Sequence, residues 1–240
     1  MNIILLKNDD YINGTNTVLL NDHRHKHVFK ILQPVLGQSL KVGIMNGRCG
    51  YGRVICIDPE KLVLEVFLHD QPPPRHQFDL ILALPRPKML RRILRTIAEF
   101  GVQNLYLINS ARVEKSYWQS PFLYPENIQK ALMRGMERSK DPVMTNVSLH
   151  KRFRPFIEDQ LADICGSRPC WITDMHAKHS AIDMDIQSQP SIVMIGPEGG
   201  FVSFEVALAT SRNAKSIHLG SRVLSVDTAI TTVLAQALPS

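Results

Sequence analysis

The chain has no uninterrupted run of about 18 apolar residues, the length that a membrane-spanning helix requires. Its opening, MNIILLKNDD, has an apolar run too short for a secretory signal peptide, and acidic residues follow it. The four cysteines form no C-x-x-C pair, so neither a disulfide framework nor a zinc site is indicated. We therefore expect a cytoplasmic protein with no membrane association and no bound metal.

What the chain does contain is enough apolar material for a core and a moderate excess of positive charge. Hydrophobic residues make up 44% of the 240 residues, and the mean hydropathy is -0.07. The formal net charge is +6, and the sequence pI is about 9.2. Such an excess suits a polyanionic partner such as RNA, although many basic proteins bind none.

The first seventy residues are rich in short extended segments. Three segments either alternate between apolar and polar residues or are mostly apolar: 40–45, 52–57 and 61–67. Asn46-Gly47, between the first two, favours a tight turn. Residues 23–32 have the spacing of a short helix. These segments predict a small β-barrel or sandwich.

The three consecutive prolines at 72–74 favour a stiff, extended spacer. We place the domain boundary there, with a small β domain at 1–71 and a larger domain at 72–240. In the larger domain, strands alternate with helices, which predicts an α/β fold with a mostly parallel sheet covered on both faces. The predicted strands are 78–84, 105–108, 143–149, 170–174, 191–195 and 216–219, and the predicted helices are 88–100, 125–138, 152–164, 203–212 and 227–238.

Two loops follow strands of this predicted sheet, where ligands of such sheets bind. The first, 195–201, reads IGPEGGF, and its glycines permit close approach of backbone to a ligand, although a tight turn alone would also explain them. It is neither G-x-G-x-x-G nor a P-loop. The second, 219–229, reads LGSRVLSVDTA and contains Arg222, an unusual residue for a simple connection.

Together the two loops resemble the RsmE-type family of the SPOUT superfamily, bacterial methyltransferases that make N3-methyluridine in 16S ribosomal RNA. The family element I-G-P-E-G-G-F is matched completely at 195–201. The later element, L-G-x-R-[IV]-L-R-x-E-T-A, departs at Ser225 and Asp227, and the stretch 137–142 departs from E-Q-x-G-R. The later element is matched at Leu219, Gly220, Arg222, Val223, Leu224, Thr228 and Ala229.

The resemblance implies a trefoil knot in the C-terminal domain, a PUA-like RNA-binding barrel at 1–71, and a homodimer with the site near the subunit interface. It also implies S-adenosylmethionine as cofactor and 16S rRNA of the small ribosomal subunit as substrate. The residues expected to bind the cofactor are Thr173, Ile195, Gly196, Gly199, Gly200, Leu219, Gly220, Val223, Leu224 and Thr228.

Methyl transfer to uracil N3 requires the N3 proton to leave, so a base or a charge-stabilising cation is needed. We assign the second role to Arg222, whose planar guanidinium suits a carbonyl or phosphate oxygen. Glu198 either acts as the base, holds its loop or orients the cofactor. Basic residues that would contact RNA, unless they form only a solvated face, are Arg86, Lys88, Arg91, Arg92 and Arg112.

Two other functions fit the same residues. Ser225, where the family pattern has arginine, is compatible with a SPOUT methyltransferase acting on another RNA base or on a ribose hydroxyl. A ribosome-associated RNA-binding protein without catalytic activity is the second alternative, and cofactor binding would distinguish it.

Overall fold

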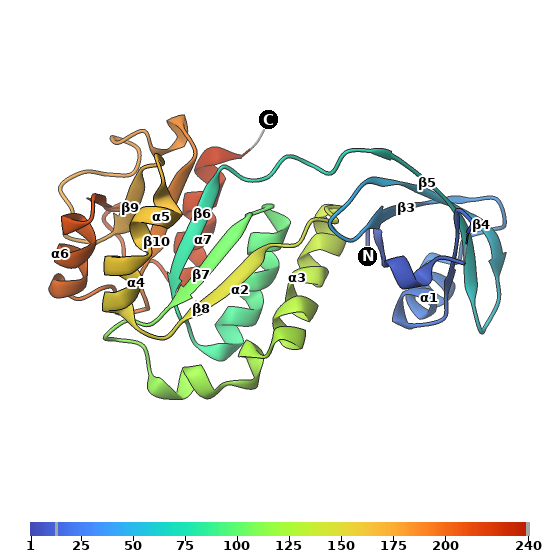
Figure 1. Ribbon diagram of the computed structural model, residues 1–240, viewed down its shortest axis with the longest axis horizontal. Helices are drawn as coiled ribbons and strands as arrows, with labels where there is room; N and C mark the ends of the chain where they lie inside the picture. Colours follow the sequence, from blue (N-terminus) through green and yellow to red (C-terminus); the bar gives the residue numbers. More distant parts are fainter. Residues whose placement is uncertain (13, 239–240) are drawn as a thin grey trace. The chain divides into compact units, whose positions relative to one another are not determined.

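The computed structural model describes residues 1–12 and 14–238 (Figure 1). The chain divides into two compact units: Met1–Pro73 with Met133–Met144, and Pro74–Leu132 with Thr145–Ser240. The segment 133–144 joins the first unit through backbone hydrogen bonds such as Asn2 N to Glu137 O, at 2.8 Å. No local sequence pattern indicates that grouping.

The first unit contains a five-stranded sheet in the order β1-β3-β4-β5-β2, in which only the β1–β3 pair is parallel. Asn46 adopts a positive φ of 58° between β3 and β4, as the predicted turn requires. Strands β1 and β2 were not predicted, because runs of three and four residues carry no readable alternation. The elements are β1 (Ile4–Leu6), η1 (Asn8–Asp10), β2 (Thr17–Leu20), α1 (His23–His27), η2 (Val28–Leu32), β3 (Ser39–Ile44), β4 (Cys49–Ile57) and β5 (Leu62–Asp70).

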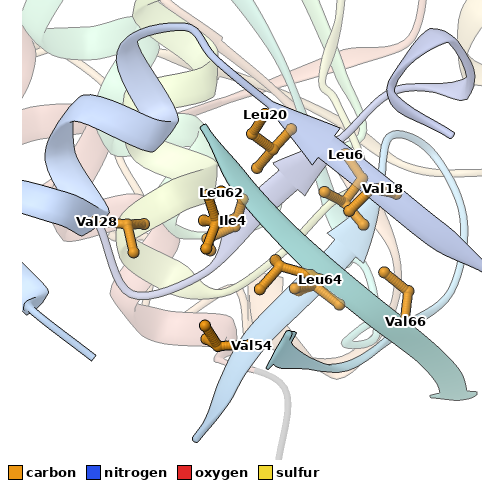
Figure 2. Close-up of a cluster of buried hydrophobic side chains, with 10 residues drawn as sticks. Ile4, Leu6, Val18, Leu20, Val28, Val54, Leu62, Leu64 and Val66 are labelled. Atoms are coloured by element: carbon orange, nitrogen blue, oxygen red, sulfur yellow. The ribbon is translucent and has the colours of Figure 1, made fainter. Parts of the chain in front are cut away.

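The core of this unit follows the period of two along β5. Leu62, Leu64 and Val66 are buried, whereas the residues between them are partly exposed. Figure 2 shows these side chains together with Ile4 and Val28, which come from β1 and η2. Side chains from all five strands and one helix therefore share one apolar cluster.

A buried arginine anchors α1 to the first strand. Arg24 is 4% exposed and donates from Nη1 to Asp10 Oδ2 at 2.6 Å and to the Leu5 carbonyl at 2.7 Å. Asp22, the N-cap of α1, accepts from Arg24 Nε at 3.0 Å. A buried cation is tolerated only with such partners, so this network fixes the helix on the sheet.

The second unit contains a six-stranded sheet in the order β11-β9-β10-β6-β7-β8, and every neighbouring pair is parallel. The predicted α/β class and mostly parallel sheet are therefore confirmed. Every residue of β6 and β10 is buried, as expected of central strands with both faces covered. The strands are β6 (Phe78–Ala83), β7 (Asn104–Ile108), β8 (Asn146–His150), β9 (Cys170–Thr173), β10 (Ser191–Ile195) and β11 (Ala214–Ile217).

Helices lie on both sides of this sheet (Figure 1). The helices from Pro74 onward are α2 (Pro87–Glu99), η3 (Lys115–Gln119), η4 (Pro121–Leu123), α3 (Pro125–Ser139), α4 (Phe153–Asp159), α5 (Leu161–Cys165), η5 (Ile186–Ser188), α6 (Ser203–Ser211), α7 (Val226–Leu234) and η6 (Ala235–Ala237). The part of α3 from Met133 onward belongs to the first unit. None of the helices in the described ranges is long and apolar enough to cross a membrane.

Several predicted helix boundaries are wrong. The single helix expected at 152–164 is two helices, because Gln160 leaves the helical region at φ -123° and ψ -29°. Ser203 is not the N-cap of α6; Val202 holds that position. Similarly, Ser225 rather than Asp227 precedes the first turn of α7. Residues that favour caps also occur within the first turn, so their presence locates a helix start only within a few positions.

A buried histidine joins the start of β6 to the end of α7. His76 Nε2 lies 3.0 Å from the Leu234 carbonyl, and His76 Nδ1 accepts from the Phe78 N–H at 3.0 Å. These partners select the neutral tautomer protonated at Nε2. Burial lowers the pKa of His76 below its ordinary value.

We expect the second unit to lose stability as the pH falls below about 6.5, the ordinary pKa of histidine. The unfolded chain takes up a proton on His76 at a higher pH than the folded chain, so acid favours unfolding. Urea unfolding followed by Trp118 and Trp171 fluorescence at pH 7.5 and 5.5 measures this. His76→Gln should show a smaller pH dependence; a residual dependence belongs to His150, whose pKa burial also lowers. An unchanged pH dependence in the variant would contradict the assignment.

Candidate functional site

A cavity of about 370 Å³ opens at the carboxyl ends of β9, β10 and β11. It is lined by residues 173–176, by 195–203, by part of 218–229 and by Arg112. The two glycine-bearing loops therefore meet in one cavity. Its volume falls within the range of about 300–1,000 Å³ typical of small-molecule sites.

Eight of the ten residues predicted to bind a cofactor line this cavity, and two do not. The structure does not bring Gly220 or Thr228 to it. Gly220 instead turns the chain at φ 116°, and its N–H donates to His218 Nδ1 at 3.1 Å. Thr228 lies in the first turn of α7, where its hydroxyl is 2.9 Å from that of Ser225. The eight that line the cavity are Thr173, Ile195, Gly196, Gly199, Gly200, Leu219, Val223 and Leu224.

The loop at 195–201 folds tightly on itself. A Cβ on Gly196 would lie 3.0 Å from Phe201 N and 3.2 Å from backbone atoms of Gly200, tighter than most Cβ contacts, so the backbone would have to shift. Gly200 has φ 72°, and its N–H donates to the Pro197 carbonyl at 2.7 Å. The Phe201 ring packs against the Phe153 ring of α4, with 6.0 Å between the ring centroids, and this contact holds Phe201 in place. The loop shape thus depends on glycine at two positions for two different reasons.

The ends of the neighbouring strands form a further wall of the cavity. Thr173 Oγ1 donates to the Met194 carbonyl at 3.1 Å, which joins the ends of β9 and β10. The Asp174 N–H donates to the Ile217 carbonyl at 2.9 Å. The Asp174 carboxylate accepts from the His176 N–H at 3.0 Å. The wall is therefore a hydrogen-bonded extension of the sheet.

Both predicted catalytic residues line the cavity and are exposed. Glu198 Oε1 lies 3.7 Å from Nε of Arg86, and Arg86 is the residue that precedes α2. None of the ion pairs in the described part of the chain involves Arg222. Arg222 is thus available to a ligand, whereas Glu198 already has a cationic neighbour.

The predicted RNA-contacting residues separate into two groups. Lys88, Arg91 and Arg92 are exposed on α2, and Arg91 lies 6.0 Å from the Phe122 ring centroid. Arg112 instead donates to the Gly199 carbonyl and lines the cavity. It therefore belongs with the glycine loop rather than with the basic face of α2.

Ser225 and Asp227, two of the positions that depart from the family pattern, interact with each other at the start of α7. Ser225 Oγ donates to Asp227 Oδ1 at 2.6 Å, and Arg92 Nη2 lies 3.4 Å from Asp227 Oδ2. The hydrogen bond from Ser225, with a further contribution from Arg92, lowers the pKa of Asp227. Ser225 and Asp227 thus find polar partners in each other and, for Asp227, in Arg92.

Sequence analysis missed several residues of this region, among them His176, His218 and Glu205. His176 and His218 line the cavity, and His218 immediately precedes a motif residue, so its proximity was a usable signal. Glu205 is 2% exposed and accepts three hydrogen bonds. Val202, the N-cap of α6, is a local partner, but Ser110 and Ala111 come from a distant part of the chain, so no local pattern reveals that attachment.

Comparison with known proteins agrees with these features. The model of the RNA methyltransferase domain family matches residues 71–238. Ribosomal RNA small subunit methyltransferase E of Treponema pallidum is 26% identical over 99% of this chain and 91% of its own length. Methyltransferase E 1 of Borreliella burgdorferi is 22% identical over 95% of this chain and 94% of its own length.

A crystal structure of ribosomal RNA small subunit methyltransferase E from Neisseria gonorrhoeae, bound to S-adenosylmethionine, shares the fold. Its TM-score is 0.77 at 18% identity, over 98% of this chain and 95% of that one. The family match covers more than two thirds of the sequence and includes both glycine-bearing loops. The chain therefore belongs to the RNA methyltransferase family, which confirms the relationship predicted from those two loops.

Proposed function

We propose that this protein uses S-adenosylmethionine to methylate N3 of a uridine in 16S ribosomal RNA of the small subunit. The observation that carries the proposal is the single cavity formed by the two glycine-bearing loops at the carboxyl ends of parallel strands. The names of the Treponema and Borreliella relatives, small subunit methyltransferases E, support the substrate. The cofactor in the Neisseria crystal structure supports the choice of methyl donor.

The residues of the cavity fit this cofactor. Ile195, Leu219 and Leu224 provide apolar surface for an adenine ring. The loop around Gly196 packs its backbone tightly, and we propose that its N–H and C=O groups read the adenine edge. Each such hydrogen bond adds about 0.5–1.5 kcal/mol, so several are needed, together with the apolar contacts, for micromolar affinity.

The bound cofactor would supply a methyl group already activated on a sulfonium. The protein must hold the uracil edge and offset the negative charge that develops on the base as N3 loses its proton. Arg222 has the planar guanidinium that suits O2 or O4 of the ring. Glu198, whose Oε1 lies 3.7 Å from Arg86 Nε, is the proposed proton acceptor.

The uracil N3 atom lies on the pairing edge, so the target base must be unpaired or turned out of its helix. We propose that Lys88, Arg91 and Arg92, exposed on α2, contact phosphates beside the target. We also propose that the first unit is a PUA-like RNA-binding domain and the second a SPOUT domain with a C-terminal trefoil knot. The family resemblance supports both assignments, as it supports a homodimer and a cytoplasmic location.

The direct experiment is incubation of the purified protein with methyl-labelled S-adenosylmethionine and small ribosomal subunits that lack the modification. We expect label in one uridine of the 16S rRNA, released as N3-methyluridine on nucleoside analysis. Subunits that already carry the modification are the matched control and should accept no label.

Two outcomes would contradict the proposal in different ways. Label in another nucleoside would favour a methyltransferase with a different RNA target, the alternative that Ser225 motivates. Absence of cofactor binding at millimolar concentration, measured by calorimetry, would favour an RNA-binding protein without catalytic activity.

A further inference from the structure

Glu205 is an ionisable side chain of the second unit that is buried and does not line the cavity. Glu205 of α6 is 2% exposed, and glutamate is rarely buried unless its oxygens are paired. Its Oε1 accepts from the Ala111 N–H at 2.7 Å. Its Oε2 accepts from Ser110 Oγ at 3.0 Å and from the Val202 N–H at 3.0 Å. Both carboxylate oxygens are therefore used.

These three donors come from two separate segments. Val202 directly follows the glycine loop, whereas Ser110 and Ala111 follow β7, with Ala111 94 residues from Glu205 in the sequence. Ser110 is also buried, at 2% exposure. The carboxylate thus fastens the 110–112 segment to the start of α6.

The next residue after this attachment reaches the cavity. Arg112 donates to the Gly199 carbonyl, and its Cδ would lie 3.0 Å from a Cβ on Gly199. Arg112 itself is exposed, so its side chain is held by its backbone position and by this one bond. Fixing Ala111 therefore determines where Arg112 meets the glycine loop.

We propose that Glu205 is a positioning residue for the cofactor site. It holds the 110–112 segment so that Arg112 keeps the Gly199 carbonyl, and with it the glycine loop, in the shape that binds the cofactor. This inference rests on the proposed function, because the loop is taken to bind S-adenosylmethionine. Glu205 acts through Arg112 and makes no contact with the cofactor.

The role requires a carboxylate rather than an amide. A carboxylate only accepts hydrogen bonds, whereas glutamine presents two N–H donors at one of its two positions. In Glu205→Gln, that amide must face either the Ala111 N–H or the Val202 N–H, and one backbone bond is lost. The side-chain volume is almost unchanged, so the variant tests the hydrogen bonds rather than the packing.

The test is calorimetric titration of S-adenosylmethionine into four proteins: wild type, Glu205→Gln, Arg112→Ala and the double variant. We expect Glu205→Gln to weaken binding by about tenfold, the effect of one charge-assisted hydrogen bond. Because Glu205 acts through Arg112, adding Glu205→Gln to Arg112→Ala should change the dissociation constant by less than about twofold. Glu126→Gln, an exposed matched control on α3, should bind like wild type.

A second readout separates positioning from a general loss of stability. In Glu205→Gln, hydrogen exchange should accelerate at the Ala111 or the Val202 amide, whichever loses its acceptor, while the central strands β6 and β10 stay protected. If Glu205→Gln does not fold, Ser110→Ala removes one donor, keeps both backbone bonds and should weaken binding by about threefold. Multiplying effects in the double variant, or unchanged affinity in Glu205→Gln, would overturn the inference. Failure of wild type to bind the cofactor would instead overturn the proposed function.

Discussion

Replacing Arg222 by alanine is expected to lower the rate of methyl transfer by roughly 10²- to 10³-fold, the usual effect of removing one donor that stabilises developing charge. Affinity for S-adenosylmethionine should stay within a few-fold of wild type. Arg222 lines the cavity and forms no ion pair with a described residue, so its positive charge is available to the uracil ring. Single-turnover labelling and calorimetry measure the two quantities separately.

Two further variants make this result specific. Arg222→Lys keeps the charge but loses the planar fork, so we expect an intermediate rate. Arg212→Ala, an exposed arginine outside the cavity, should transfer methyl at the wild-type rate. Activity within a few-fold of wild type in Arg222→Ala would show that this residue has no part in the chemistry.

Gly196→Ala is expected to weaken cofactor binding by about tenfold or more. The new Cβ would lie 3.0 Å from Phe201 N and 3.2 Å from Gly200 backbone atoms, and backbone cannot move aside as a side chain can. The loop backbone must therefore shift by a few tenths of an ångström, and because a 1 Å misplacement at a site costs about 10², a smaller but clear loss is expected. Calorimetric titration with S-adenosylmethionine measures the change, and a thermal melt establishes that the variant is folded.

Gly199→Ala provides the matched comparison within the same loop. Its Cβ would meet only the Arg112 side chain, at 3.0 Å from Cδ, and this flexible chain can shift. We expect a much smaller loss of affinity. Equal losses at both positions would mean that the steric account of the loop is wrong.

The fold of the second unit was largely predictable because its signals are local. Strands β6 and β10 are short apolar runs, and α2 buries residues at helical spacing, including Leu90, Ile93 and Ile97. In the first unit, β1 and β2 were missed since their pairing partners β3 and β5, and not their own composition, make them strands.

The site was predictable where it depends on chain direction. Loops that follow parallel strands gather at one edge of the sheet, so 195–201 and 219–229 were both expected at that edge. The order of the strands was not predicted. The contribution of each residue did not follow, because side-chain direction within a loop depends on local turns. The Gly220 N–H instead bonds to His218, and the Thr228 hydroxyl, in the first turn of α7, lies beside that of Ser225. Glu205 was invisible because its donors Ser110 and Ala111 come from another strand's loop.

The central claim is that two separate loops form one cofactor cleft, and hydrogen exchange with and without S-adenosylmethionine tests it most directly. We predict that the cofactor slows amide exchange in 195–202 and in 218–226 together, at the same ligand concentration. Protection confined to one of these segments, or absent from both at saturating cofactor, would contradict the account.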